Sequence, residues 1–335
     1  MQRILITTLV VAGLHGVGGD AVALRDGDPL AFERPAAGCA PTIVVDAVSR
    51  ATGKSPTRPI ASPEIALQAP GTYCLGEDVT QARMWDWHAN GFKTSSDAVG
   101  VVSIEDDDIR FDLAGHRVEN RWYPHGGGLI FLFRRASFDD GYVVQRATVR
   151  NGTIISPGAM GIGARLLAMG KWGARNQGKP VELQQGQQPL DHFPDTGHLL
   201  ERLMIHGGKH AIVIDGRNNV IRDNHLVVDS STAIVATGPG LLLEGNDIEV
   251  KGTLELLRGD EAPPYAVRLV QADGAVIRNN RIRYTGGTQG RPSAAAFQLV
   301  ESRDVTFEGN RLEAVGALVS ADARSSHGPT APAGR

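Results

Sequence analysis

The chain repeats one short pattern four times, each time around an asparagine. The four stretches are NNVIRDNHLVV (218–228), GLLLEGNDIEV (240–250), GAVIRNNRIRY (274–284) and DVTFEGNRLEA (304–314). Each has an apolar residue three positions before its asparagine and another two positions after it. Because asparagine is rare inside strands and common in turns, each stretch predicts two short strands joined by a bend. The asparagines at these bends are Asn224, Asn246, Asn280 and Asn310.

A third apolar segment precedes each stretch and completes a repeating unit. It reads AIVI (211–214), AIVA (233–236), AVRL (266–269) and AFQL (296–299), and its first residue lies 13 or 14 positions before the asparagine. The closest asparagines, Asn224 and Asn246, are 22 residues apart (246 − 224). A period of this length, with strands and no helix, predicts a solenoid whose coils stack at the ~4.8 Å spacing of β-strands. Equivalent residues then lie above one another, and we expect the four asparagines to form a ladder.

Charged residues alternate in sign from one unit to the next. Two positions before the asparagine the units have Arg222, Glu244, Arg278 and Glu308, and three positions after it Val227, Glu249, Arg283 and Glu313. Stacking would place opposite charges on neighbouring strands, where each exposed pair contributes a few tenths of a kcal/mol. The alternation therefore supports the predicted register.

These repeats, together with three earlier phrases, resemble the parallel β-helix proteins of the pectin-lyase-like superfamily. PGTYCLGEDV (70–79) is similar to their opening coil, and DIRFDLAGHRVEN (108–120) and ATVRNGTI (147–154) are similar to their early rungs. The resemblance covers roughly residues 67–320 and implies an all-β fold, a single-stranded right-handed parallel β-helix. It is specific for architecture and not for activity, because this scaffold hosts several chemistries.

The segments on either side of the repeats predict accessory structure. Residues 24–66 are interpreted as an N-terminal cap and linker, in which 41–53 form a short capping helix with its apolar residues on one face. The stretch after Ser320, residues 321–335, is rich in small and polar residues and is expected to be a disordered tail.

The first 23 residues are typical of a secretory signal peptide. Arg3 is followed by an apolar stretch from Ile4 to Leu14, and Ala21-Val22-Ala23 is a small-x-small cleavage site. The alternative is a buried first strand or helix, but a Gly-rich polar stretch follows the apolar one. We therefore expect export to the periplasm or the medium, where Cys39 and Cys74 would form a disulfide.

The composition excludes some partners. The formal net charge of −3 indicates neither nucleic acid nor an anionic membrane surface as a partner. No apolar run is long enough to span a bilayer, and we expect a monomer.

Insertions between the repeats predict a binding groove. We expect segments 156–197, 251–264 and 285–293 all to follow the strand after the asparagine bend and to wall one side of the helix. Basic residues and one tryptophan in them suit an acidic polysaccharide, because cations bind carboxylates and tryptophan stacks on sugar rings. The alternative is a solvated surface whose charges maintain solubility. The candidate substrate-binding residues are Arg165, Lys171, Trp172, Arg175, Lys179, Lys251, Arg258 and Arg291.

One polar cluster suggests a general base or a metal site. The sequence DHFPDTGH supplies Asp191, His192, Asp195 and His198. These residue types bind divalent metals or accept protons, but their spacing matches no motif with an established mechanism. The alternative is a turn that Pro194 shapes and the polar side chains cap.

The resemblance implies a polysaccharide-active protein, that is a lyase, hydrolase, epimerase or non-catalytic relative. A uronate lyase needs a base and a cation, either Ca²⁺ or Arg and Lys side chains, to stabilise the charge next to the carboxylate. The "NTD" and "GHG" signatures of polygalacturonases and the "DPHD" signature of uronan epimerases are absent, so no catalytic residue is carried over. Our first hypothesis is an exported protein that binds an acidic polysaccharide and cleaves it by β-elimination. The second is a non-catalytic glycan-binding or envelope protein.

Overall fold

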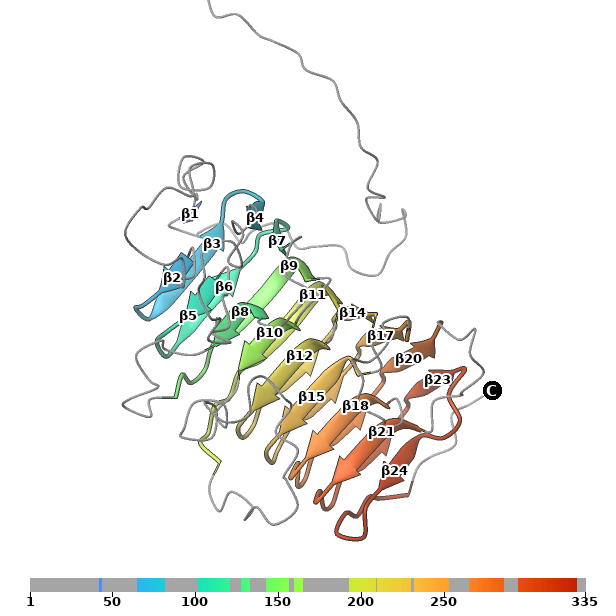
Figure 1. Cartoon of the computed structure of the whole chain (residues 1–335). Coiled ribbons are helices and arrows are strands. Elements are labelled where there is room, and N and C mark those ends of the chain that lie inside the picture. Colours follow the sequence, from blue (N-terminus) through green and yellow to red (C-terminus); the bar gives the residue numbers. More distant parts are fainter. Residues whose placement is uncertain are drawn as a thin grey trace, which may run out of the picture. The chain divides into compact units, whose positions relative to one another are not determined.

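The strands of this chain form two parallel sheets that coil around one apolar core. The computed structural model describes residues 42–43, 65–81, 102–120, 128–132, 143–156, 160–164, 193–208, 210–229, 232–252, 265–285 and 295–329. Within these ranges, one sheet has 15 strands and the other nine (Figure 1). We call the larger one sheet A and the smaller one sheet B. Every pairing between strands is parallel, as a β-helix requires.

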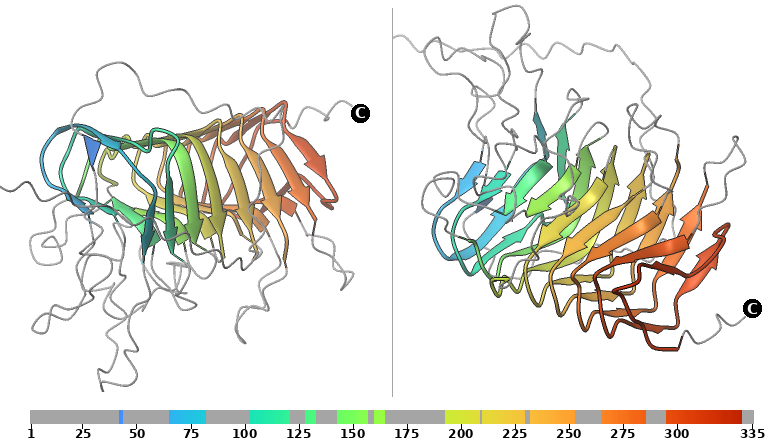
Figure 2. Two further views of the ribbon diagram at one scale, coloured as in Figure 1. Left: turned by 90° about the horizontal axis from the view of Figure 1, so that it is seen from above. Right: turned by 60° about the horizontal axis from the view of Figure 1, so that its bottom comes forward.

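Sheet B contributes one strand to each coil. Its strands stack in chain order, which the colour sequence in Figures 1 and 2 follows from blue to red. They are β2 (Ile65–Leu67), β5 (Val102–Ile104), β8 (Gly128–Leu132), β10 (Met160–Ala164), β12 (His210–Asp215), β15 (Ile234–Thr237), β18 (Tyr265–Val270), β21 (Ala295–Val300) and β24 (Val319–Ala321).

Sheet A contributes two consecutive strands to most coils, and we call the two stacks rows A1 and A2. Row A1 contains β1 (Thr42–Ile43), β3 (Gly71–Leu75), β6 (Ile109–Asp112), β13 (Val220–Arg222), β16 (Leu242–Glu244), β19 (Val276–Arg278) and β22 (Thr306–Glu308). Row A2 contains β4 (Val79–Gln81), β7 (Arg117–Asn120), β14 (His225–Val228), β17 (Asp247–Val250), β20 (Arg281–Tyr284) and β23 (Arg311–Glu313). The longer strands β9 (Thr148–Ser156) and β11 (Leu199–Gly207) run through both rows.

The predicted register is confirmed. In sheet B, Ile212 aligns with Ile234, Ile234 with Val267, and Val267 with Phe297. All four are buried in the core, as the period of apolar residues predicted. Column stacking of this kind buries apolar side chains between neighbouring coils, which a single coil could not do.

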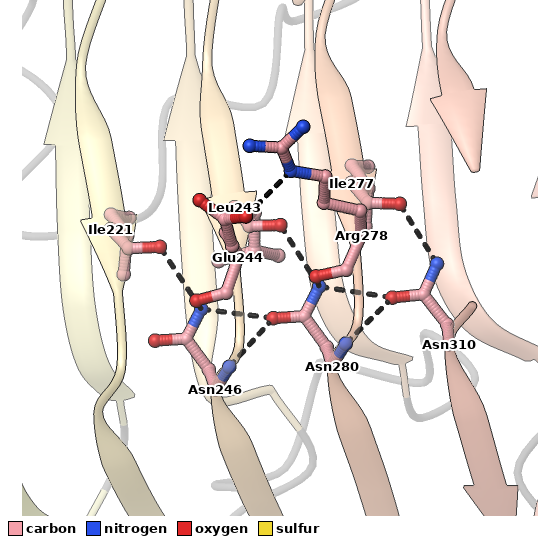
Figure 3. A network of polar contacts seen from close by, with 8 residues as sticks. All are labelled: Ile221, Leu243, Glu244, Asn246, Ile277, Arg278, Asn280 and Asn310. Carbon is pink, nitrogen blue, oxygen red and sulfur yellow. Dashed lines mark hydrogen bonds and ion pairs between the residues drawn. The ribbon is translucent and has the colours of Figure 1, made fainter. Parts of the chain in front are cut away.

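The asparagine ladder is also confirmed, and Figure 3 shows its last three members. The amide nitrogen Nδ2 of Asn224 donates to Oδ1 of Asn246 at 3.0 Å, that of Asn246 to Asn280 at 2.9 Å, and that of Asn280 to Asn310 at 3.0 Å. Each of these amides also donates to a backbone carbonyl of the preceding coil, such as Ile221 O for Asn246 at 3.0 Å. The ladder thus satisfies backbone groups that the bend removes from the strand pairing.

The left-handed backbone lies one residue before each ladder asparagine. The positive φ angles belong to the residues that precede Asn224, Asn246, Asn280 and Asn310. These are Asp223 (54°), Gly245 (66°), Asn279 (57°) and Gly309 (61°). Glycine, asparagine and aspartate tolerate this conformation best, and these are the three residue types found there.

Both ends of the repeat region differ from the prediction. Thr42 and Ile43, assigned to the capping helix, instead form strand β1, which pairs with Cys74 and Leu75 of β3. The rest of that helix lies outside the described residues. The expected disorder from residue 321 is wrong as far as residue 329, because His327 forms a parallel bridge with Val305 and its ring lies 6.0 Å from that of Phe307.

Cys74 takes part in a disulfide bond. Its expected partner, Cys39, and the signal peptide lie outside the described part of the chain, so the pairing and export stay predictions. No helix in the described ranges has the length and apolarity needed to cross a membrane.

The insertions leave the coils at two corners and not at one. Met160–Ala164, placed within a single insertion 156–197, forms strand β10 and pairs with β8 and β12 of sheet B. The connection 165–192 therefore follows a sheet B strand and leads into row A1, whereas 253–264 and 286–294 follow row A2 and lead into sheet B. One corner precedes row A1 in the coil, and the other follows row A2. The prediction that all insertions follow the same strand is therefore wrong.

Candidate functional site

The outer surface of row A2 carries a dense group of ionisable side chains. In β14 and β17, inward residues such as Leu226 and Ile248 are buried, and the residues between them face outward and are partly exposed. Two further residues, Asp229 and Lys251, follow directly after these strands. We call this surface the polar face of row A2, and it consists of His206, His225, Asp229, Asp247, Glu249, Lys251, Arg281 and Arg283.

One histidine on this face is held by a carboxylate of the next coil. Nε2 of His206 lies 3.2 Å from each carboxylate oxygen of Asp229, and Nζ of Lys251 lies 3.5 Å from the same carboxylate. Partial burial acts to raise the pKa of Asp229, but the hydrogen bond and charge of His206, together with Lys251, outweigh it and lower that pKa. Asp229 therefore stays ionised and accepts a hydrogen bond from Nε2–H of His206.

A second histidine–carboxylate pair lies one coil further along. Nδ1 of His225 lies 3.4 Å from the carboxylate of Asp247. The same carboxylate forms an ion pair with the guanidinium of Arg283 at 3.1 Å. Burial again acts to raise the pKa of Asp247, and the contacts with His225 and Arg283 reverse the effect and lower it. Arg283 also lies 3.6 Å from Glu249, which confirms the predicted charge pairing across row A2.

Row A1 carries a column of alternating charge that is longer than the sequence indicated. Seven successive rungs place opposite charges next to each other in register: Asp112, Arg150, Glu201, Arg222, Glu244, Arg278 and Glu308. Arg150 lies 2.8 Å from Asp112, Arg222 lies 2.6 Å from Glu201, and Arg278 lies 2.7 Å from Glu244, the pair drawn in Figure 3. Neighbouring charges in the column pair with one another and stabilise the stack.

Most residues proposed from the sequence lie outside the described part of the chain. This holds for Arg165, Lys171, Trp172, Arg175, Lys179, Arg258, Arg291, Asp191 and His192. Of the proposed substrate-binding residues, Lys251 is described, and it belongs to the polar face of row A2. The groove and its loops therefore stay a prediction.

His198 and Asp195 lie in different surroundings. His198 is buried, its Nδ1 accepts the backbone N–H of Ala147 at 3.2 Å, and burial lowers its pKa to about 4. Asp195 is exposed and accepts the Nδ2–H of Asn218 at 2.8 Å. Both side chains thus serve the corner between sheet B and row A1. Among the described residues, no three His, Cys, Asp or Glu side chains gather as a metal site requires.

The sequence missed His206, His225 and Asp229 as site residues. The signal that identifies them is the register: His206 and Asp229 are separated by 23 residues, about one coil. Insertions of different length change this separation between coils, so a constant spacing would not find such pairs.

Comparisons with known proteins identify no family for this chain. No protein-family model matches the chain, and no curated protein matches it. Among solved structures, the A-module of a mannuronan C-5 epimerase from Azotobacter vinelandii is similar, with a TM-score of 0.30 and 10% sequence identity over 80% of this chain and 84% of the module. A similarity of this size does not carry an activity over to this chain.

Proposed function

We propose that this protein binds an acidic polysaccharide along the polar face of row A2 and cleaves it by β-elimination. The observation that supports this best is the combination, on one partly exposed sheet surface, of two histidine–carboxylate pairs with Lys251 and Arg283. A uronate lyase needs this pairing of a proton acceptor with a cation.

The shape of the surface suits an extended polymer. Equivalent side chains on β11, β14, β17, β20 and β23 repeat in register along the stack. Four steps of ~4.8 Å make a straight array about 19 Å long, which is enough to contact several sugars. Carboxylates, guanidinium groups and imidazoles hydrogen-bond sugar hydroxyls, and the cations additionally bind uronate carboxylates.

The cations of this face keep donors for a ligand. The guanidinium of Arg283 has five N–H donors, and the structure uses some of them for Asp247 and Glu249. Lys251 has three donors and contacts Asp229. Ca²⁺ is the cofactor that this chemistry would suggest in addition, and its requirement is part of the test.

The test combines binding with turnover on a panel of uronic-acid polymers: polygalacturonate, alginate and hyaluronan, with dextran as the neutral control. Affinity is measured at low and moderate salt, and turnover by the absorbance of unsaturated product with and without Ca²⁺. We expect tight binding of one acidic polymer, no binding of dextran, and new absorbance. If no acidic polymer binds, the proposed function is wrong.

Charge-removing variants locate the binding surface. Lys251→Gln together with Arg283→Gln should weaken affinity about tenfold or more, since a hydrogen bond to a charged group contributes ~1.5–3 kcal/mol. The matched control, Arg303→Gln with Arg324→Gln, removes the same charge from exposed positions near the C-terminal end of the stack and should change affinity less than about threefold. Equal effects would place binding elsewhere. Lys171→Ala with Arg175→Ala tests the predicted loop contribution in the same way.

A non-catalytic role in glycan binding or in the envelope is the second candidate. It is favoured by the mutual pairing of charges on both rows, since a surface that only stabilises the stack would show the same pairs. Binding of an acidic polymer without unsaturated product, in both the presence and the absence of Ca²⁺, would identify this role.

A further inference from the structure

His206 lies where strand β11 ends, at the corner that leads to sheet B. Its side chain is 31% exposed, whereas that of Asp229 is 21% exposed. The backbone holds both residues in place, because Asp229 N–H donates to Gly207 O at 3.2 Å. The imidazole is therefore fixed in direction while it stays in contact with solvent.

The contact with Asp229 selects one state of the ring. Both carboxylate oxygens lie 3.2 Å from Nε2, so Nε2 carries the proton and donates a hydrogen bond to Asp229. The neutral ring then has its lone pair on Nδ1, which makes Nδ1 the atom able to accept a proton. Lys251 lies next to this pair and carries the opposite charge to a uronate.

We infer that His206 is the proton acceptor of the elimination reaction, with Asp229 as its positioning residue and Lys251 as the group that binds the substrate carboxylate. This inference rests on the proposed function and assigns residues to it.

The step is balanced without any further reactant. Nδ1 of His206 takes the proton from the sugar carbon next to the carboxylate, and the electron pair of that C–H bond forms a carbon–carbon double bond. The bond from the neighbouring carbon to the glycosidic oxygen breaks, and this oxygen leaves with the bonding electrons and takes a proton from solvent. The imidazolium then returns its proton to solvent. The ammonium of Lys251 offsets the charge that develops on the carboxylate.

His116 lies outside the polar face of row A2 and therefore provides the control. Its side chain is 36% exposed, and its Nδ1 lies 3.4 Å from the carboxylate of Asp78. His206 and His116 share residue type, partial exposure and a carboxylate partner. They differ in position, because His116 precedes strand β7 in an early coil.

The experiment compares turnover of the polymer that binds best. His206→Gln should lower kcat about 100-fold or more, the range of a removed general base, with polymer affinity changed less than about threefold. His116→Gln should retain kcat within about threefold. Asp229→Asn should lower kcat about tenfold with little change in KM, because the acceptor stays present but loses its orientation.

A second variant separates loss of the base from loss of structure. His206→Ala should regain part of its activity when imidazole is added to the solution, whereas Asp229→Asn should not. Turnover of His206→Gln equal to that of the wild type would overturn the assignment and leave the proposed function intact. Binding without turnover on every polymer would overturn both the assignment and the cleavage part of the proposed function, and the absence of binding would overturn the proposed function as a whole.

Discussion

The side chain of Asn246 joins three coils, and its removal tests how strongly the ladder stabilises the stack. Its Nδ2 donates to Ile221 O at 3.0 Å, to Glu244 O at 3.1 Å and to Asn280 Oδ1 at 2.9 Å. Its Oδ1 accepts the backbone N–H of Asn224 at 3.1 Å and the Nδ2–H of the same residue at 3.0 Å. Asn246 is 1% exposed, so water does not replace these partners.

Asn246→Ala should lower the free energy of unfolding by about 4 kcal/mol. The largest contribution is the backbone N–H of Asn224, which loses its acceptor inside the protein; a buried unsatisfied donor costs ~1–3 kcal/mol. The other bonds contribute ~0.5–1.5 kcal/mol each where no second partner exists, and Asn224 Nδ2 keeps a bond to Leu200 O at 3.0 Å.

Urea denaturation followed by circular dichroism measures this loss. The matched control is Asn218→Gly, which removes an exposed asparagine whose Nδ2 donates to Asp195 at 2.8 Å, keeps its left-handed backbone (φ 59°) without strain and should cost less than about 1 kcal/mol. If both substitutions shift the denaturation midpoint equally, the ladder does not stabilise the fold and the reasoning fails.

Two further predictions concern buried ionisable groups. Because the pKa of His198 is about 4 in the folded protein and 6.5 without the fold, the unfolded state binds more protons between these values. The stabilisation that neutral His198 provides is therefore complete above pH 6.5. The free energy of unfolding falls by about 3 kcal/mol as the pH drops towards 4. Denaturation midpoints measured over this range should fall less steeply for His198→Gln, and identical slopes would contradict the assignment. Arg150→Met should cost about 3–5 kcal/mol, because it leaves the 1% exposed Asp112 without its ion-pair partner. A denaturation midpoint that equals that of the wild type would show that Asp112 finds another partner.

The sequence predicted the coils because their chemistry recurs at fixed positions. Each unit places an asparagine, such as Asn224 or Asn246, between apolar residues at the same spacing. The structure predicted for one unit therefore applies to all of them. The alternating charges of row A1 were predicted for the same reason. The full column was missed because Asp112 and Arg150 lie in early rungs where no asparagine occupies the ladder position.

Strand β10 was missed because its sequence lacks the usual strand residues. Gly161 occupies an inward position where a Cβ atom would lie 2.4 Å from Cγ2 of Ile205 and 2.8 Å from the carbonyl oxygen of Ala211. Only glycine fits there, and glycine predicts a loop when the neighbouring coils are unknown. The sequence therefore placed the insertions at one corner, whereas the fold divides them between two.

The sequence could not predict the candidate site for a related reason. His206 and Asp229 carry no local motif, and they meet because successive coils align Gly207 with Val228. Chemistry of this kind arises from the register, which depends on the length of every coil and insertion between the residues. Lys251 was proposed from its place in an insertion, and it belongs to the polar face because it follows directly after β17.

Chemical modification of histidines tests the proposed binding surface most directly. Diethyl pyrocarbonate reacts with exposed imidazoles, and mass spectrometry gives the extent of modification at His206, His225 and the exposed His327 of the last coil. With a saturating uronic-acid polymer, we predict that His206 and His225 are protected and that the modification of His327 is unchanged. Equal modification of His206 and His225 with and without bound polymer would contradict a binding site on the polar face of row A2.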